Sequence, residues 1–372
     1  SSLIFTGGAD DDLLVNMGGL PMQLNLGGDT DTLLEGNATI GSLNFGGDDG
    51  NDLLLNRGTL SSLVFTGGAD DDLLRNLGSI SGTLNFGGDS GTDMLLNTGS
   101  LGSVIFTGGA DEDLLINNGS VATSLNVGGD QELLVGSGTI AGLNFGGDSG
   151  NDVLVNLSSI GSVIFTGGAD DDLLINIGSS SMTLNFGGDQ DILLNGAGSL
   201  ATLNFGGDSG NDQLINGGQV SSVIFTGGAD DDLLINTANN ITSLNFGGDS
   251  GNDLLQNSGT GIASIVFGGD SGADLLTNSG SIASVTFTGG ADADLLTNTG
   301  TITGTLNFGG DSGSDLLQNS GTLAGVIFTG GADEDLLVNT GTVTGTLNFG
   351  GDSGNDMLYN TASLAGVIVT GG

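Results

Sequence analysis

Acidic side chains recur at one fixed place in a repeated unit, directly before a pair of leucines. The aspartates at this place are Asp12, Asp52, Asp72, Asp93, Asp113, Asp152, Asp172, Asp212, Asp232, Asp253, Asp274, Asp294, Asp315, Asp335 and Asp356. Further acids precede them in a glycine-rich turn, as at Asp10, Asp70, Asp111 and Asp170. Carboxylates beside turn carbonyls are the hard oxygen ligands that Ca²⁺ prefers. This chemistry makes a row of calcium sites one candidate function of the repeat.

Two hypotheses account for how this acidic row is neutralised. If successive copies stack at the spacing of β-strands, each neighbouring pair of carboxylates repels by about 0.9 kcal/mol in water. The chain has only two basic residues to offset 44 acids. One hypothesis is a solvated acidic ridge neutralised by diffuse monovalent ions. The other is bound Ca²⁺, with Asp52, Asp72, Asp93, Asp113, Asp152, Asp172, Asp212, Asp232, Asp253 and Asp356 as the predicted ligands.

A catalytic function is disfavoured by the same residues. Paired carboxylates can hydrolyse glycosides. Here, however, every acid is one copy of a repeated row, and no unique cluster interrupts the pattern. The chain has no His and no Lys, and its single Tyr is Tyr359. We therefore predict that the protein is not an enzyme and that it has no cofactor other than the possible calcium.

The elements that position these acids follow from a period of about 20 residues. All 16 Phe residues occupy one slot of the repeat, and Leu26, Val127 and Val369 fill that slot where Phe is missing. A fixed period of this length is typical of a solenoid. The 75 Gly residues make long helices improbable, and short alternating segments between Gly, Asp, Asn and Ser clusters indicate strands and turns.

We predict an all-β fold: a right-handed parallel β-helix of about 18 coils of about 20 residues, forming one elongated domain over residues 1–372. Each coil is predicted to have three strands. Residues 84–86 form the first, with Leu84 and Phe86 inward, residues 95–97 lie in the second, and residues 99–101 open the third. The second leucine of each pair is predicted to be the most regular core position. These leucines are Leu14, Leu34, Leu54, Leu74, Leu95, Leu115, Leu134, Leu154, Leu174, Leu194, Leu214, Leu234, Leu255, Leu276, Leu296, Leu317, Leu337 and Leu358.

Three coils have a shortened acidic turn, at residues 27–32, 128–132 and 187–192. In the same coils Gly36, Gly136 and Gly196 stand two residues after the leucine pair, where most coils have Asn. We infer that this Asn side chain hydrogen-bonds either the long turn or its own copy one coil away, because a buried amide needs such partners. The alternative is that the three glycines coincide with the short turns by chance.

Composition excludes several partners. A net charge of −42 argues against nucleic acid and against anionic membranes. The sequence has no apolar run of 18 residues, so no membrane span is predicted, and the absence of Cys excludes a disulfide framework. Aliphatic residues directly before the Phe slot recur every second or third coil, as at Val64, Ile105 and Ile164. They form either a lateral contact surface or scattered exposed side chains.

The two ends of the sequence are at the same phase of the repeat. Residues 3–8 open the chain with the pattern that residues 367–372 repeat, and neither end has a polar cap. A solenoid with open ends presents strands for further pairing. We therefore expect either a segment of a longer array or a subunit that associates end to end.

Two families resemble this repeat. Residues 298–310, with Asn298, Gly300, Ile302, Leu306 and Phe308, resemble repeats in the passenger regions of bacterial autotransporters and large surface adhesins. That resemblance covers essentially the whole chain and implies an extracellular or cell-surface β-helix used as a stalk, adhesin or fibre. No translocator barrel accompanies it here.

Residues 147–154 and 207–212 also resemble the calcium-binding nonapeptide repeats of RTX proteins. Asp152 and Asp212 match the aspartate of that motif best, although an extra residue intervenes and the period is about 20. Taken together, the residues and resemblances predict a structural spacer or filament on a bacterial surface. The alternative is an adhesin that binds a surface partner through its acidic or aliphatic face.

Overall fold

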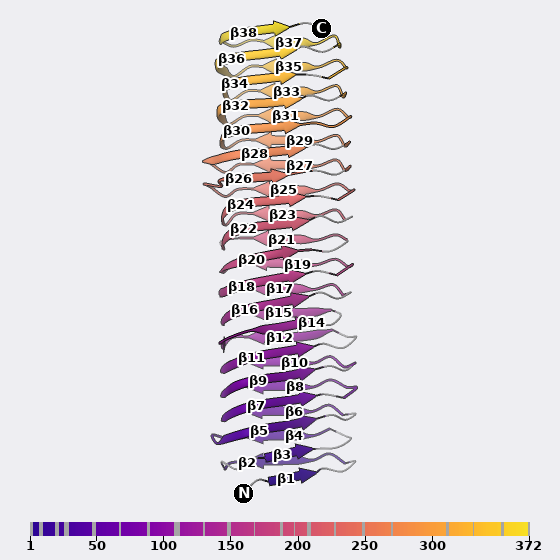
Figure 1. Ribbon diagram of the computed structural model, residues 1–372, viewed down its shortest axis with the longest axis vertical. Coiled ribbons are helices and arrows are strands. Elements are labelled where there is room, and N and C mark those ends of the chain that lie inside the picture. The colour runs from indigo at the N-terminus through magenta and orange to yellow at the C-terminus, as the bar shows by residue number, and fades with distance from the viewer. Residues whose placement is uncertain are drawn as a thin grey trace. The chain divides into compact units, whose positions relative to one another are not determined.

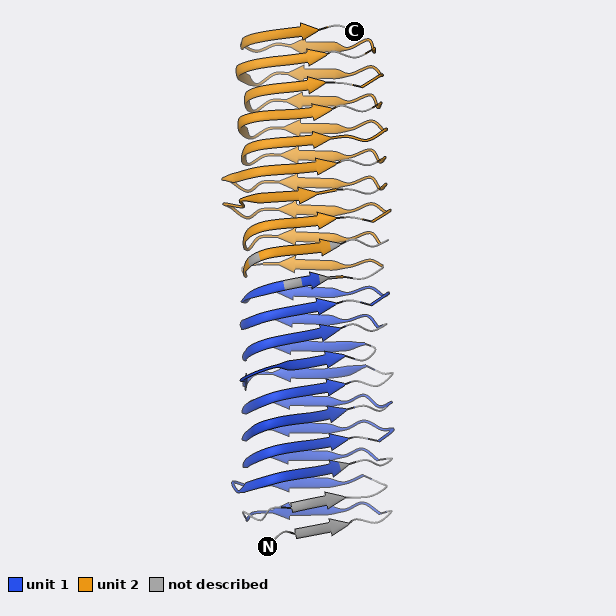
Figure 2. Ribbon diagram, in the orientation of Figure 1, with its two compact units in different colours: residues 1–184 blue, residues 185–372 orange. Residues whose placement is uncertain are grey.

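The computed structural model divides into two compact units, residues 1–184 and 185–372 (Figure 2), and each is described by itself. The residues that the structure describes are 3–6, 10–18, 22–25, 30–46, 50–66, 68–87, 90–107, 112–128, 131–146, 150–166, 168–186, 189–196, 198–206, 210–226, 228–247, 250–268, 271–309, 312–329, 331–350 and 353–370. These residues form strands and turns and contain no helix, and therefore no helix long and apolar enough to cross a membrane.

Unit 1 alternates short and long strands. The short strands are β2 (Leu13–Asn16), β4 (Thr32–Glu35), β6 (Leu53–Asn56), β8 (Leu73–Asn76), β10 (Met94–Asn97), β12 (Asp113–Asn117), β15 (Glu132–Gly136), β17 (Val153–Asn156) and β19 (Leu173–Asn176). The others are β1 (Leu3–Thr6), β3 (Met22–Asn25), β5 (Thr39–Gly46), β7 (Thr59–Thr66), β9 (Ser79–Gly87), β11 (Ser100–Thr107), β13 (Ser120–Val121), β14 (Leu125–Gly128), β16 (Thr139–Gly146), β18 (Ser159–Thr166) and β20 (Ser179–Asn185).

Unit 2 repeats this alternation. Its short strands are β21 (Ile192–Asn195), β23 (Gln213–Asn216), β25 (Leu233–Asn236), β27 (Leu254–Asn257), β29 (Leu275–Asn278), β31 (Leu295–Asn298), β33 (Leu316–Asn319), β35 (Leu336–Asn339) and β37 (Met357–Asn360). Its long strands are β22 (Ser199–Gly206), β24 (Gln219–Thr226), β26 (Ser243–Phe246), β28 (Ile262–Gly268), β30 (Ser281–Thr288), β32 (Thr301–Gly309), β34 (Thr322–Thr329), β36 (Thr342–Gly350) and β38 (Leu364–Thr370).

Equivalent strands of successive coils pair in parallel, with like residues opposite one another. Leu74 pairs with Leu95, Asn76 with Asn97, and Phe65 with Phe86. Each unit is thus a parallel β-solenoid, as predicted. Within each unit in Figure 1, the coils ascend with the nearer strands running left to right and the more distant strands right to left, so the coil is right-handed.

The prediction of three strands per coil is wrong, because most coils have two. The segments 79–80 and 84–86 belong to one continuous strand, β9, since Ser81, Gly82 and Thr83 between them keep an extended backbone. Strands of nine residues accommodate their additional residue as a local register shift against an eight-residue neighbour, as between β9 and β11. In one described coil of unit 1, the long strand is divided into β13 and β14.

The core lies between the short-strand and long-strand sheets. Inward side chains at the Leu and Phe positions, such as Leu95 and Phe86, are fully buried. Neighbouring Phe rings lie with centroids between 4.5 Å and 5.4 Å apart, and most pairs are stacked or tilted. A single coil could not bury these side chains alone, so each coil is stabilised by its neighbours.

Two predicted core leucines are wrong by one position. Leu33 and Leu193 are fully buried and pair with Leu54 and Leu214, whereas Leu34 and Leu194 are only partly buried. The shortened turns of these two coils place their strands one residue earlier relative to the neighbouring coil. Because side chains alternate between faces, this shift exchanges which leucine points inward.

Candidate functional site: the acidic turn edge

Among the residues that the structure describes, the negative charge lies almost entirely at one edge of the coils. Every described acidic residue except Glu35 lies on the segment that joins a long strand to the next short strand, or on the first residue of that short strand. The long strands contain no charged residue. We call these joining segments the acidic turn edge.

The predicted ligand aspartates form a buried row within this edge. One acid per coil is 0–2% exposed, which places it inside the coil next to the leucine core. In unit 1 the described members are Asp31, Asp52, Asp72, Asp93, Asp113, Glu132, Asp152 and Asp172; in unit 2 they are Asp191, Asp212, Asp232, Asp253, Asp274, Asp294, Asp315 and Asp335. Asp12 and Asp356 occupy the same position but are partly exposed. The prediction of a solvated ridge is therefore wrong for this row.

Each buried aspartate caps the backbone of a neighbouring coil. The Asp52 N–H donates to Asp72 Oδ1 at 2.7 Å, and the Asp232 N–H donates to Asp253 Oδ1 at 3.0 Å. Hydrogen bonds of this kind stabilise the ionised form of a carboxylate, whereas burial and like-charged neighbours disfavour it. The row thus satisfies backbone donors beside most of the short strands at an electrostatic cost. At β12 the Asp113 N–H donates instead to the Gln131 carbonyl oxygen.

Sequence reasoning missed three members of the row, namely Asp31, Glu132 and Asp191. They lie in the coils with shortened turns, where Glu132 pairs with Asp113 and the N–H of Asp191 donates to Asp212 Oδ1 at 3.0 Å. Their signal was present in the sequence, because each is an acid two residues before the leucine that is buried. For Asp31 and Asp191 the signal was lost because the leucine pair, not the acid, set the alignment. Glu132 stands directly before its leucine pair and was missed because the row was defined by aspartates alone.

An exposed outer row lies directly before the buried acids, and one or more neutral residues separate its acids from one another. In unit 1 it is Asp11, Thr30, Asn51, Asp71, Thr92, Glu112, Gln131, Asn151 and Asp171; in unit 2 it is Gln190, Asn211, Asp231, Asn252, Ala273, Ala293, Ser314, Glu334 and Asn355. Within each unit no two successive coils carry an acid here. Outer acids also hydrogen-bond their neutral neighbours, as Asp71 Oδ1 accepts from the Thr92 N–H at 2.9 Å.

The structure does not gather the ten predicted calcium ligands into a cluster. It places them in a single file, one per coil, with Oδ1 of the buried members accepting a backbone N–H. Among the described residues, no group of three or more acids is arranged to hold a metal ion. Calcium binding therefore remains a prediction.

The asparagine after each leucine pair forms a second buried ladder. Asn76 Nδ2 donates to Asn97 Oδ1 at 2.8 Å, and Asn97 Nδ2 donates to Asn117 Oδ1 at the same distance. The Oδ1 atom also accepts the backbone N–H two residues later, as from Gly99 at 3.1 Å. Of the two partners predicted for this Asn, its own copy one coil away is therefore the correct one.

Two of the three predicted glycine replacements in this ladder are wrong. Asn195 continues the ladder to Asn216 at 2.7 Å, so Gly196 lies one residue beyond it. In the first shortened coil Glu35 takes the position, accepting from Asn16 Nδ2 at 2.8 Å, and Gly36 lies beyond it. The Gly136 prediction is confirmed, since Gly136 pairs with Asn117 and Asn156.

Gly136 leaves the asparagine ladder interrupted in unit 1. Asn117 Nδ2 is buried and makes no hydrogen bond. A Cβ atom built on Gly136 would meet nothing closer than Ile140 Cδ1 at 3.9 Å, so the position has room for a side chain. The interruption is thus a missing amide in an otherwise unchanged backbone.

We expect Gly136→Asn to raise the free energy of unfolding by about 1–2 kcal/mol. The new amide would accept from Asn117 Nδ2 and donate to Asn156 Oδ1, and satisfying a buried donor is worth about this much. Urea unfolding of the two proteins measures the change. Gly136→Ala is the matched control, because it tests the loss of glycine flexibility without the amide; equal gains from both variants would contradict the ladder account.

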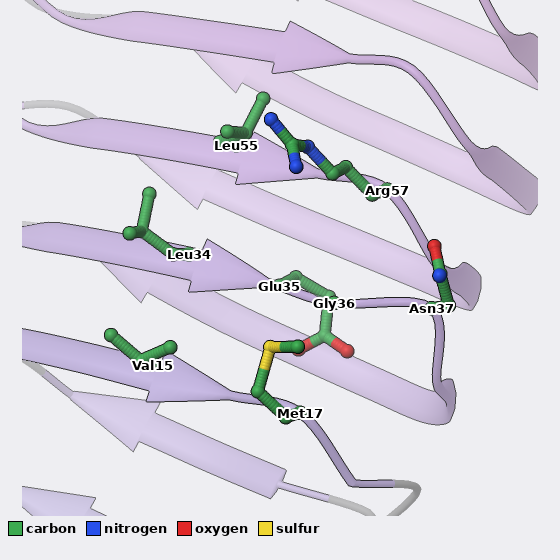
Figure 3. A pocket seen from close by; sticks show the side chains of 8 residues that line it. All are labelled: Val15, Met17, Leu34, Glu35, Gly36, Asn37, Leu55 and Arg57. Carbon is green, nitrogen blue, oxygen red and sulfur yellow. The ribbon is translucent and has the colours of Figure 1, made fainter.

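Glu35 is the acid outside the acidic turn edge, and it lies in a cavity of about 210 Å³ on the short-strand side of unit 1. Figure 3 shows its carboxylate turned toward Met17, while Arg57 extends beside Leu55. Burial raises the pKa of Glu35 above its ordinary value, and the hydrogen bond from Asn16 opposes this. Its Oε1 atom is buried without a hydrogen bond.

We expect Glu35→Gln to stabilise unit 1 at neutral pH and to lose that advantage in acid. Because the folded-state pKa is raised, burying the ionised carboxylate weakens the native protein above that pKa. As the pH falls through the raised pKa toward the ordinary pKa of 4.5, protonation removes the cost. Urea midpoints of both proteins from pH 4 to pH 8 test this. A pH-independent difference would contradict it, and Glu112→Gln controls for removing an exposed charge.

The comparisons with known proteins identify no relative. No family model matches the chain, and neither a curated protein nor a solved structure matches it. The functional argument therefore depends on the coil geometry and on the residues themselves.

Proposed function

We propose that this protein is a structural, non-catalytic β-helix that forms a stalk, spacer or filament on the outside of a bacterial cell. The observation that carries the proposal is the repetition of the same contacts in coil after coil. Within each unit, Asn and Phe side chains contact their own copies, as in the pairs Asn257–Asn278 and Phe267–Phe287, and an Asp carboxylate accepts the backbone N–H of its copy, as Asp253 does from Asp232. Such ladders add stability with every coil. The extracellular location is supported by the resemblance to autotransporter and adhesin repeats.

The acidic turn edge gives this structural role a dependence on cations. Its buried acids succeed one another at every coil with only two basic residues in the chain. We expect NaCl to raise the thermal unfolding midpoint, because salt screens repulsion between like charges. The more specific form of this proposal is that the turns bind calcium. It is tested by adding a chelator at fixed ionic strength; equal midpoints would leave monovalent ions as the only neutralising cations.

The alternative function is an adhesin that binds a surface partner. The observation that favours it is the set of aliphatic side chains exposed on the long-strand sheets, including Val64, Ile164 and Ile224 at 39%, 49% and 38%. A stalk needs no such side chains, whereas a binding face does.

Electron microscopy of the isolated chain tests the proposal. Extended particles or fibres are expected if the coils serve as a spacer or filament. Long fibres would favour self-assembly, whereas monodisperse extended particles would favour a stalk or an adhesin segment. Compact, rounded particles would contradict the structural function in both forms.

A further inference from the structure

The long-strand sheet of unit 2 presents an uncharged face. None of its nine strands contains Asp, Glu, Lys or Arg. Its outward positions carry Ser, Thr, Gly, Ala and Asn, with Ile224, Val266 and Ile327 exposed at 38–40%. In a chain with a net charge of −42, another strongly acidic molecule meets little repulsion at this uncharged face.

A hollow lies on this face beside one of the exposed aliphatics. It measures about 400 Å³ and is lined by Thr305, Gly325, Val326, Ile327, Thr346 and Asn348. Its origin is a difference in strand length. The nine-residue strands β32 and β36 flank the eight-residue strand β34, and their register shifts place Thr305 and Thr346 next to Gly325. The side chain missing at Gly325 leaves the space between the two threonines.

We propose that a second copy of this chain packs on this face, with Ile327 of each copy in the hollow over Gly325 of the other. The proposal rests on the structural function above and names the partner that such a stalk or filament takes. Ile327 and Gly325 are two residues apart on β34, on either side of Val326. A two-fold axis that passes over Val326 along the direction of coil stacking brings each isoleucine opposite the partner's glycine.

The area of the face is sufficient for a stable pair. Nine strands at about 4.8 Å spacing and about eight residues in length give roughly 1,000 Å². Stable interfaces bury about 800 Å² per partner, so this single face exceeds the requirement.

The same two-fold axis keeps the charges apart. Because it reverses the strand direction across the interface, the acidic turn edges of the two copies lie on opposite sides of the pair. The long strands between them span about 26 Å, which exceeds the Debye length of about 8 Å at physiological ionic strength. Association should therefore persist at physiological salt and weaken at very low salt.

Sedimentation velocity of the full chain, from low to high micromolar concentration, tests the pairing. Wild-type protein is expected to show a monomer–dimer equilibrium, and Ile327→Lys is expected to weaken it at least tenfold. Gln318→Lys, which adds the same charge on the exposed face of short strand β33, is the matched control and should change the dissociation constant less than twofold.

A second variant keeps the test decisive if the lysine disturbs folding. A Cβ atom on Gly325 would meet nothing closer than the Thr346 carbonyl oxygen at 3.8 Å, so Gly325→Val fits the strand while filling the hollow. We expect it to abolish the dimer with unchanged circular dichroism. A wild-type protein that stays monomeric, or a dimer that none of these substitutions changes, overturns the proposal. Extended but monomeric particles would leave the structural function intact and remove only this pairing.

Discussion

Replacing Asn298 with alanine is expected to lower the free energy of unfolding by about 2–5 kcal/mol. The side chain accepts from Asn278 Nδ2 at 2.8 Å and donates to Asn319 Oδ1 at 2.8 Å. Its removal deprives the buried Asn278 Nδ2 of this acceptor and the buried Asn319 Oδ1 of this donor. Each unsatisfied buried group costs about 1–3 kcal/mol.

Asn307→Ala is the matched control for this prediction. Asn307 is in the same unit and lies on the exposed side of long strand β32, so its loss should change stability by less than about 0.5 kcal/mol. Urea unfolding gives both values, and amide hydrogen exchange locates the weakened coils. Equal effects of the two substitutions would show that the buried amide ladder does not stabilise the stack.

Replacing Phe267 with alanine is expected to cost about 3–5 kcal/mol, the usual range for a buried aromatic residue. Phe267 is fully buried, and its ring lies between those of Phe246 and Phe287, at centroid distances of 5.1 Å and 4.9 Å. The substitution removes two ring contacts and leaves a cavity that the flanking coils cannot close, since their backbones are fixed by hydrogen bonds on both sides.

The adjacent residue provides the control. Val266 precedes Phe267 on β28 but points outward and is 40% exposed, so Val266→Ala should change stability by less than about 1 kcal/mol. Thermal unfolding followed by circular dichroism compares the two variants. If Val266→Ala proved as costly as Phe267→Ala, the assignment of inward and outward faces on the long strands would be wrong.

Most of the fold could be predicted because the position of Phe in each repeat shows how successive repeats align. One Phe per coil at a nearly constant spacing places Phe over Phe, and the structure shows this in pairs such as Phe308 and Phe328. The number of strands per coil was harder to predict. The Ser, Thr and Gly residues before Leu84 suit both a turn and an extended strand, and only packing against neighbouring coils selects the strand.

The burial of the aspartate row was predictable in principle. Asp72 is two residues before Leu74, and Asn76 two residues after it, so alternation along an extended segment places all three side chains on one side. The prediction failed because charged residues are rarely buried without a partner of opposite charge. What composition does not show is that a neighbouring coil supplies backbone N–H groups for the carboxylates.

The shortened coils show the limit of alignment by hydrophobic residues. In residues 30–36 the two candidates for the core position are adjacent, and the leucine pair alone does not decide between Leu33 and Leu34. Counting from Asp31 would have chosen Leu33, which is the buried one. The uncharged long-strand face could not be recognised before the strands were assigned.

Disulfide trapping in this cysteine-free chain tests the stacking of like residues most directly. Ser264 and Ser284 are register partners on β28 and β30, so cysteines introduced at both should lie about 5 Å apart and oxidise to an intramolecular bond. Cysteines at 264 and 286 would be offset by two residues, about 8 Å apart, and should stay reduced under the same conditions. Rapid bonding of the first pair and none of the second is the result we predict. Equal bonding of both pairs, or bonding of the second alone, would contradict the stacked-coil structure.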